Sequence, residues 1–159
     1  MRAVAFTVLV ALIASPAVAF SAAPAAPAPP IPANDEAAII QVVSEAYVDG
    51  IHNFRNPVAI RKGFHPGFEM LVLKDGQLDK LPIETWIQNL EARNQKEPPP
   101  KDGKRTTEAR FPRVDVTGSA AICKVEIGRD GKLVFTDYLS LYKFADGWKI
   151  VGKTFFRHP

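Results

Sequence analysis

Glycine-containing turns that recur about every 12 residues organise the second half of the chain. The turns Thr117-Gly118, Arg129-Asp130-Gly131 and Ala145-Asp146-Gly147 separate runs that are rich in β-branched and aromatic residues. Regular spacing of this kind predicts long antiparallel strands joined by tight connections. We therefore expect four consecutive strands, at residues 106–116, 120–127, 133–144 and 148–156.

Helical periodicity characterises much of the chain before these strands. A first helix is expected from Asn34 or Asp35 to residues 51–53, because apolar residues recur at helical spacing: Ile39, Ile40, Val43, Ala46 and Tyr47. Asn56-Pro57 opens a short second helix that Gly63 ends. A third helix is expected at 83–94, where Ile83, Trp86, Ile87 and Leu90 form an apolar stripe.

A turn and a hairpin connect the second and third helices. Phe64-His65-Pro66-Gly67 is interpreted as a turn, and Asp75-Gly76 is a strong hairpin signal between strands at 68–73 and 77–81. Helices that precede a run of strands indicate an α+β domain rather than alternating βαβ units. We expect a cone-shaped, curved antiparallel sheet, made of a hairpin plus a four-strand meander, packed against three N-terminal helices.

The N-terminal residues predict export. Arg2 precedes an uncharged apolar run that is too short to span a bilayer comfortably, and Ala17-Val18-Ala19 presents small residues to signal peptidase. We expect a signal peptide at 1–19, with Ala23 as an alternative cleavage site and an uncleaved anchor as the competing interpretation. Residues 20–33 are a Pro/Ala-rich spacer, so the folded domain is expected at 34–159. The protein is expected to be periplasmic or secreted, with no stable membrane insertion.

Several segments resemble a known superfamily. They are Ala46–Gly50, Phe64-His65-Pro66, Thr136–Leu141 and Asp146–Val151. Over about residues 35–156 the chain resembles the nuclear transport factor two-like (SnoaL-like) superfamily, and within it the putative lumazine-binding group. The resemblance implies a cone with an internal cavity and a homodimer formed through the outer sheet face.

Charge and motif content argue against several function classes. The net charge is +3, and basic and acidic residues alternate over 96–113, whereas a nucleic-acid site needs clustered positive charge. His52, His65 and His158 lack metal-ligand spacing, and no phosphate-binding glycine loop is present. We therefore expect no cofactor, no metal and no nucleic-acid partner. The single cysteine, Cys123, lies in an apolar strand pattern and is expected to be buried.

Asp137 is the charged residue in an otherwise apolar series on one strand face: Leu133, Phe135, Asp137, Leu139 and Leu141. A buried carboxylate costs several kcal/mol unless it is paired or protonated. Asp137 is therefore either a carboxylate in the cavity or one that is paired with a basic residue or with backbone amides.

Three further residues are candidate catalytic groups. Glu69 is either a base near a ligand or a solvated strand carboxylate, and His65 either titrates near neutral pH or hydrogen-bonds its turn. Tyr47 either donates a hydrogen bond into the cavity or packs in the core. The candidate ligand-binding residues are apolar and aromatic: Trp86, Trp148, Phe68, Phe156 and Leu139. Each tryptophan either stacks on a flat ligand in the cavity or packs in the core.

Three functions follow from these residues. The leading hypothesis is a protein that binds a small apolar or aromatic molecule in the cone without a cofactor. The second is an isomerase, dehydratase or cyclase, with Asp137 or Glu69 as base and Tyr47 or His65 as donor. The third is a dimerisation or interaction module that uses an outward-facing series of side chains: Val134, Thr136, Tyr138, Ser140 and Tyr142.

Overall fold

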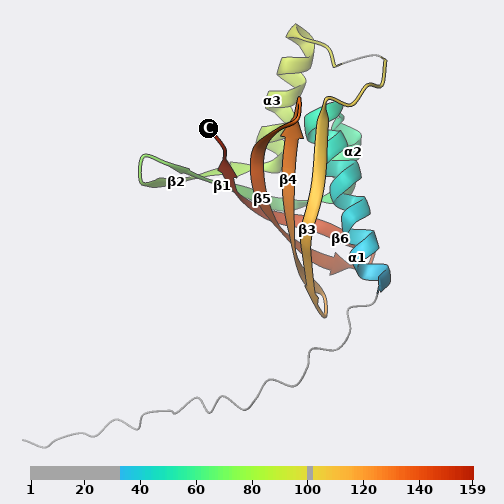
Figure 1. Ribbon diagram of the computed structural model, residues 1–159. Coiled ribbons are helices and arrows are strands. Elements are labelled where there is room, and N and C mark those ends of the chain that lie inside the picture. Colours follow the sequence, from blue (N-terminus) through green and yellow to red (C-terminus); the bar gives the residue numbers. More distant parts are fainter. Residues whose placement is uncertain (1–32, 100–101) are drawn as a thin grey trace, which may run out of the picture. The chain divides into compact units, whose positions relative to one another are not determined.

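The computed structural model describes residues 33–99 and 102–159 (Figure 1). The expected signal peptide and residues 20–32 of the expected spacer lie outside the described residues. Within the described ranges, no helix combines the length and apolarity needed to cross a membrane.

Helices precede most of the sheet, as the element order predicted. The helix α1 (Ala33–Val42) continues directly into the π-helix η1 (Val43–Asn53), and α2 (Pro57–Gly63) follows. The remaining elements are β1 (Phe64–Lys74), β2 (Gln77–Pro82), α3 (Ile83–Lys96), β3 (Thr107–Thr117), β4 (Ala120–Arg129), β5 (Lys132–Phe144) and β6 (Gly147–Arg157).

The six strands form one curved sheet in the order β2-β1-β6-β5-β4-β3. Neighbouring strands are antiparallel except β1 and β6, which pair in parallel, so the expectation of a wholly antiparallel sheet is wrong at this position. Figure 1 shows the strands bending across one another, with α1 running alongside β3. The α+β class and the cone architecture are confirmed.

Local sequence explains the element boundaries. The Asn56 side chain caps α2 by accepting hydrogen bonds from the amides of Val58 and Ala59. Asp75 and Gly76 both adopt positive φ, which is the conformation that a two-residue hairpin needs.

The predicted turn at Phe64–Gly67 is wrong, because these residues begin β1. Phe64 is buried and pairs with Ile150 of β6, which holds the chain in an extended conformation. The pairing register then shifts before Glu69. Pro66 lies in this irregular stretch, where its missing N–H interrupts no ladder hydrogen bond.

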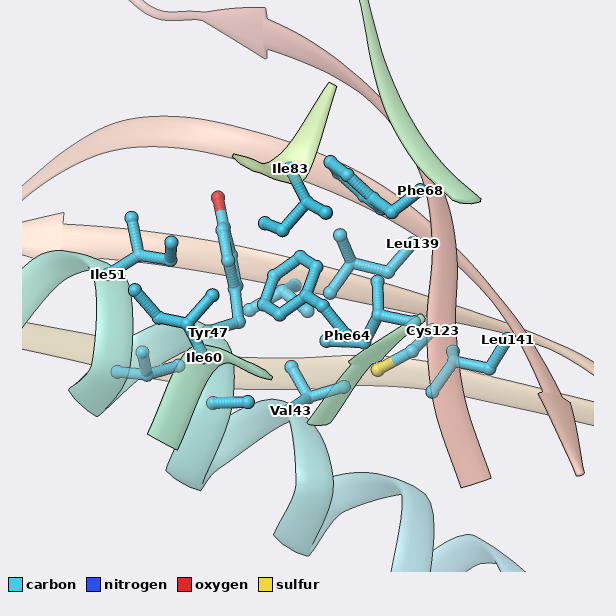
Figure 2. Packing of buried hydrophobic residues seen from close by; sticks show 14 of the residues in the cluster. Val43, Tyr47, Ile51, Ile60, Phe64, Phe68, Ile83, Cys123, Leu139 and Leu141 are labelled. Carbon is cyan, nitrogen blue, oxygen red and sulfur yellow. The ribbon is translucent and has the colours of Figure 1, made fainter. Parts of the chain in front are cut away.

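The core lies between the helices and the concave face of the sheet. Figure 2 shows η1 contributing Val43, Tyr47 and Ile51, while Cys123, Leu139 and Leu141 come from the sheet. Cys123 is fully buried as predicted, and burial raises the pKa of its thiol to about 12. The thiol is therefore uncharged at neutral pH.

A bulge in β6 determines which residues enter the cone. Leu141 pairs with Ile150 but Ser140 pairs with Gly152, so Val151 is an extra residue in the strand. Side chains alternate between the two faces of a strand, and an extra residue reverses the alternation. Trp148 and Ile150 face the core before the bulge, and Lys153 and Phe155 face it afterwards.

This reversal corrects the placement of Phe156. Unbroken alternation from Trp148 would carry Phe156 into the interior, where a ligand-binding residue was expected. Its side chain is instead 59% exposed, on the opposite face from Phe155.

A substitution at Gly63 tests how closely η1 and α2 pack against each other. A Cβ added there would overlap the Cβ of Ala46 on η1. We expect Gly63→Ala to lower the free energy of unfolding by about 1–3 kcal/mol, as overpacked sites do, in a chemical denaturation experiment. Gly152→Ala is the matched control, because its added Cβ meets neighbours only at 3.9 Å or more. Equal stability of the two variants would contradict the close approach of η1 and α2.

Candidate functional site

Three polar side chains meet inside the cone. The Tyr47 hydroxyl donates a hydrogen bond of 2.6 Å to Oδ2 of Asp137. Lys153 Nζ lies 3.0 Å from the other carboxylate oxygen, Oδ1. Tyr47 and Asp137 are 0% exposed and Lys153 is 6% exposed. We call these three residues the polar network.

Lys153 and Asp137 form a buried ion pair. Nζ and Oδ1 lie within hydrogen-bonding distance, and the charge of Asp137 favours the ammonium form of Lys153. The network therefore pairs the charge of Asp137, as one of the two sequence interpretations required.

Aromatic rings surround the ammonium group of Lys153. Its Nζ lies 4.5 Å from the centre of the Phe155 ring, 5.1 Å from that of Tyr47, 5.6 Å from Trp86 and 5.8 Å from Phe135. A cation over ring faces at these distances is attracted by the ring quadrupoles. We call these four rings the aromatic enclosure. Trp86, Phe135 and Phe155 remain partly exposed, so the enclosure forms the boundary between the core and solvent.

The π-helical geometry of η1 brings His52 beside Tyr47. A π-helix bonds residue i to residue i+5, and these two residues are five apart. Their ring centres are 4.8 Å apart, with the planes at 80°. A helical pattern in the sequence predicts the helix but not this wider turn.

His52 presents an unpaired nitrogen within the same region. Nδ1 lies 3.1 Å from a guanidinium nitrogen of Arg129, which can only donate, so Nδ1 accepts and the proton of the neutral ring resides on Nε2. Nε2 is buried and has no hydrogen-bond partner among residues 33–99 and 102–159. Burial lowers the pKa of His52 to about 3, assisted by the charges of Lys153 and Arg129.

Burial also sets the protonation of the polar network. Desolvation, followed by the charge of Asp137, raises the pKa of Tyr47 well above its usual value, so the phenol remains protonated. Desolvation lowers the pKa of Lys153, and the attraction of Asp137 opposes that shift. The site thus holds a phenol donor and an amine whose charge is less favoured than in water.

Two predicted catalytic residues lie outside the polar network. Glu69 forms an ion pair of 2.8 Å with Lys80, and its side chain is 43% exposed. His65 accepts a hydrogen bond from the Gly67 amide and stacks on Phe144. These contacts match the solvated interpretation of Glu69 and the turn-bonding interpretation of His65. Tyr47 and Asp137 are the two sequence candidates that the fold brings together.

The predicted ligand-binding residues are distributed more widely. Trp86 belongs to the aromatic enclosure, with the Phe68 ring stacked on it, and Leu139 is buried in the core. Trp148 is buried away from the network, where its indole N–H donates to Asp35. Lys153, which no sequence pattern singled out, completes the site.

Large side chains lie in the interior of the cone. Four hollows of the described residues avoid Tyr47, Trp86 and Asp137, whereas one of them, of about 370 Å³, includes Lys153 in its lining, together with Leu71 and Ile122. The largest, about 820 Å³, lies outside the cone between the α1–η1 helix, α2 and the turn that joins β5 to β6. The internal cavity that the resemblance implies is not among these four hollows, and large rings and Lys153 lie in that part of the cone.

Solved structures place the fold among the NTF2-like proteins. An NTF2-like protein of unknown function from Shewanella baltica is 23% identical, with a TM-score of 0.63 over 79% of this chain and 95% of that chain. One from Silicibacter pomeroyi is 21% identical, with a TM-score of 0.63 over 79% of this chain and 97% of that chain. One from Methylobacillus flagellatus is 20% identical, with a TM-score of 0.63 over 83% and 98%.

Family comparison is more specific than the fold. The family model described as putative lumazine-binding matches residues 34–156. The chain belongs to this family, and its fold is that of the NTF2-like structures. A search of curated proteins finds no match. The family and the fold together point to small-molecule binding.

Removing one member of the buried ion pair should lower the free energy of unfolding more than removing both members does. Lys153→Met leaves the Asp137 charge buried without a counter-charge, which we expect to lower the free energy of unfolding by about 3–5 kcal/mol. The double variant Lys153→Met/Asp137→Leu should recover part of that loss, because no buried charge remains. Lys80→Met, at the exposed pair with Glu69, is the control, with a change of at most about 1 kcal/mol. A double variant that is less stable than Lys153→Met would contradict the pairing.

Acid should destabilise the protein partly through His52. The unfolded chain binds a proton near the usual pKa of 6.5, whereas the folded protein excludes it down to about pH 3. The unfolded state therefore holds more protons across this window, and stability falls as the pH decreases through it, by up to about 1.4 kcal/mol per pH unit. In denaturation curves from pH 7 to 4, His52→Gln should lose less stability than the wild type. Parallel losses would show that His52 titrates normally in the folded state.

Proposed function

We propose that this protein binds a small planar molecule at the mouth of the cone, where Trp86, Phe135 and Phe155 enclose the Lys153 ammonium. The enclosed ammonium is the observation that carries the proposal. Flat rings that border solvent offer stacking surfaces, and an adjacent buried charge offers orientation.

The Lys153 ammonium has more N–H donors than the described residues around it have acceptors. An ammonium group carries three N–H donors, and Asp137 is its charged partner within the described residues. The rings around Nζ supply no conventional acceptor. His52 Nε2–H is a further donor without a partner in the part of the chain that the structure describes. Unpaired donors favour a ligand with oxygen acceptors.

The buried ion pair of the polar network is better suited to ligand recognition than to stabilising the fold. A buried ion pair often stabilises a domain no better than apolar residues of the same volume would. Here the pair also loses the full hydration of Lys153, as the lowered pKa of its amine reflects. A ligand carbonyl would give the ammonium an acceptor that the protein itself lacks.

Binding requires the rings to separate, because the interior is filled. Trp86 lies on α3, whereas Phe135 and Phe155 lie on the adjacent strands β5 and β6. A shift of partly exposed side chains is a common change on binding and leaves the backbone in place. The expected ligand is therefore small, flat and aromatic, with at least one carbonyl oxygen. The family description makes lumazine, a flat dicarbonyl heterocycle, the first probe.

Trp86 supplies a direct test of binding. Trp148→Phe removes the other tryptophan and leaves Trp86 as the sole indole. Titration with lumazine should quench Trp86 fluorescence to saturation. Adding Lys153→Met should weaken binding by about tenfold or more, because a hydrogen bond to a charged group is worth about 1.5–3 kcal/mol.

Lys80→Met is the matched control for charge removal and should leave lumazine binding unchanged, because Lys80 lies on β2 in an exposed pair with Glu69. Equal affinity of the Lys153→Met and Lys80→Met variants would place the ligand away from the polar network.

We also propose that binding takes place outside the cytoplasm and without a cofactor. The apolar run before Ala17-Val18-Ala19 supports export. Intact-mass measurement of the protein recovered from its host tests this, since cleavage after Ala19 fixes one expected mass. A retained Met1 in the periplasmic or secreted fraction would contradict it.

A homodimer through the outer sheet face is the further proposal about assembly. Large apolar side chains lie exposed on this face: Ile122, Tyr138, Tyr142 and Phe156. Exposed aromatic residues of this kind favour an interface. Sedimentation at micromolar concentration should give a dimer, and Ile122→Glu/Tyr138→Lys should give a folded monomer. A wild-type monomer would contradict the proposal.

A further inference from the structure

Lys153 has the surroundings of a reactive amine. Its Nζ lies 3.0 Å from a carboxylate that can take up a proton, and that carboxylate is held on its other oxygen by the Tyr47 hydroxyl. The nearest rings stand 4.5–5.8 Å from the nitrogen.

We propose that Lys153 forms an imine with small aromatic aldehydes or ketones that enter the aromatic enclosure. This inference rests on the binding site proposed above and names the substrate class of that site. It adds a covalent step to non-covalent binding, and it assigns that step to Nζ of Lys153.

The step balances with the groups present. The ammonium proton of Lys153 passes to the Asp137 carboxylate, and the free amine attacks the carbonyl carbon to form a C–N bond. Proton transfer from nitrogen to oxygen then gives a neutral carbinolamine. Asp137 returns its proton to the departing hydroxyl group, which leaves as water when the C–O bond breaks. The product is a protonated imine beside the Asp137 carboxylate.

The product keeps the charge pattern of the starting state. A protonated imine carries one positive charge on the same nitrogen, so the ion pair with Asp137 and the attraction to the surrounding rings both persist. The aryl group of the substrate would stack among Trp86, Phe135 and Phe155. Burial lowers the pKa of Lys153, which raises the fraction of uncharged amine that can attack.

Exposed lysines of the same chain provide the internal reference. Lys62 and Lys80 have side chains that are 79% and 60% exposed. Burial lowers the pKa of Lys153, which favours the uncharged amine that attacks a carbonyl carbon. An accessible Lys153 should therefore react faster than these exposed lysines.

Reductive trapping measures this directly. The purified full chain is incubated at pH 7 with benzaldehyde and cyanoborohydride, and peptide mass spectrometry follows each lysine. We expect Lys153 to be modified severalfold faster than Lys62 or Lys80. Acetaldehyde, which lacks a ring to stack, should show a smaller preference for Lys153. The same reaction on unfolded protein shows that the Lys153 peptide is detectable.

Trp86→Ala tests whether access limits the reaction. Removing this ring opens the enclosure, so acetaldehyde, which does not depend on stacking, should trap Lys153 at least as fast as in the wild type. The inference is overturned if Lys153 reacts no faster than the exposed lysines in both proteins.

Lys153→Arg separates the two proposals, because arginine keeps the charge and does not form the imine. We expect the variant to keep the lumazine quenching of Trp86 and to lose benzaldehyde trapping at position 153. In the protein that retains Lys153, lumazine quenching without preferential trapping of Lys153 overturns the imine and leaves the binding site standing, and absence of both overturns both.

Discussion

The ion pair between Asp137 and Lys153 is the constraint around which the interior is arranged. An unpaired carboxylate in this core would cost several kcal/mol, so a positively charged side chain must lie beside it. Lys153 comes from the neighbouring strand, and Tyr47 from η1 satisfies the second oxygen. The enclosing rings then separate the ammonium from water. Helix, sheet and enclosure are thus coupled through one buried carboxylate.

Two irregularities of the backbone make this arrangement possible. The bulge at Val151 reverses the side-chain alternation of β6, which turns Lys153 and Phe155 into the cone and Phe156 out of it. The π-helical turn of η1 places His52 against Tyr47. Bulges and π-helices often lie at functional sites. Their convergence on the polar network is consistent with the proposed binding role.

Much of the fold was predictable because its signals are local. Turn residues at regular spacing predict the strands, and the cost of burying Asp137 predicts a partner. The identity of that partner was not predicted, because the alternation that would place Lys153 breaks at a bulge whose local signal is the single glycine Gly152. The parallel pairing of β1 with β6 was missed for a different reason, since Phe64 and Pro66 resemble a turn locally. Tyr47 was found because helical spacing alone directs it inward.

The central claim is that an ammonium group lies among aromatic rings inside the cone, and proton NMR of the lysine ε-methylene groups tests it directly. Ring currents from Phe155, Tyr47 and Trp86 should shift the ε protons of one lysine far upfield of all others. That resonance should be absent in Lys153→Met and unchanged in Lys80→Met. Lysine ε protons that all resonate where exposed lysines do would contradict the account.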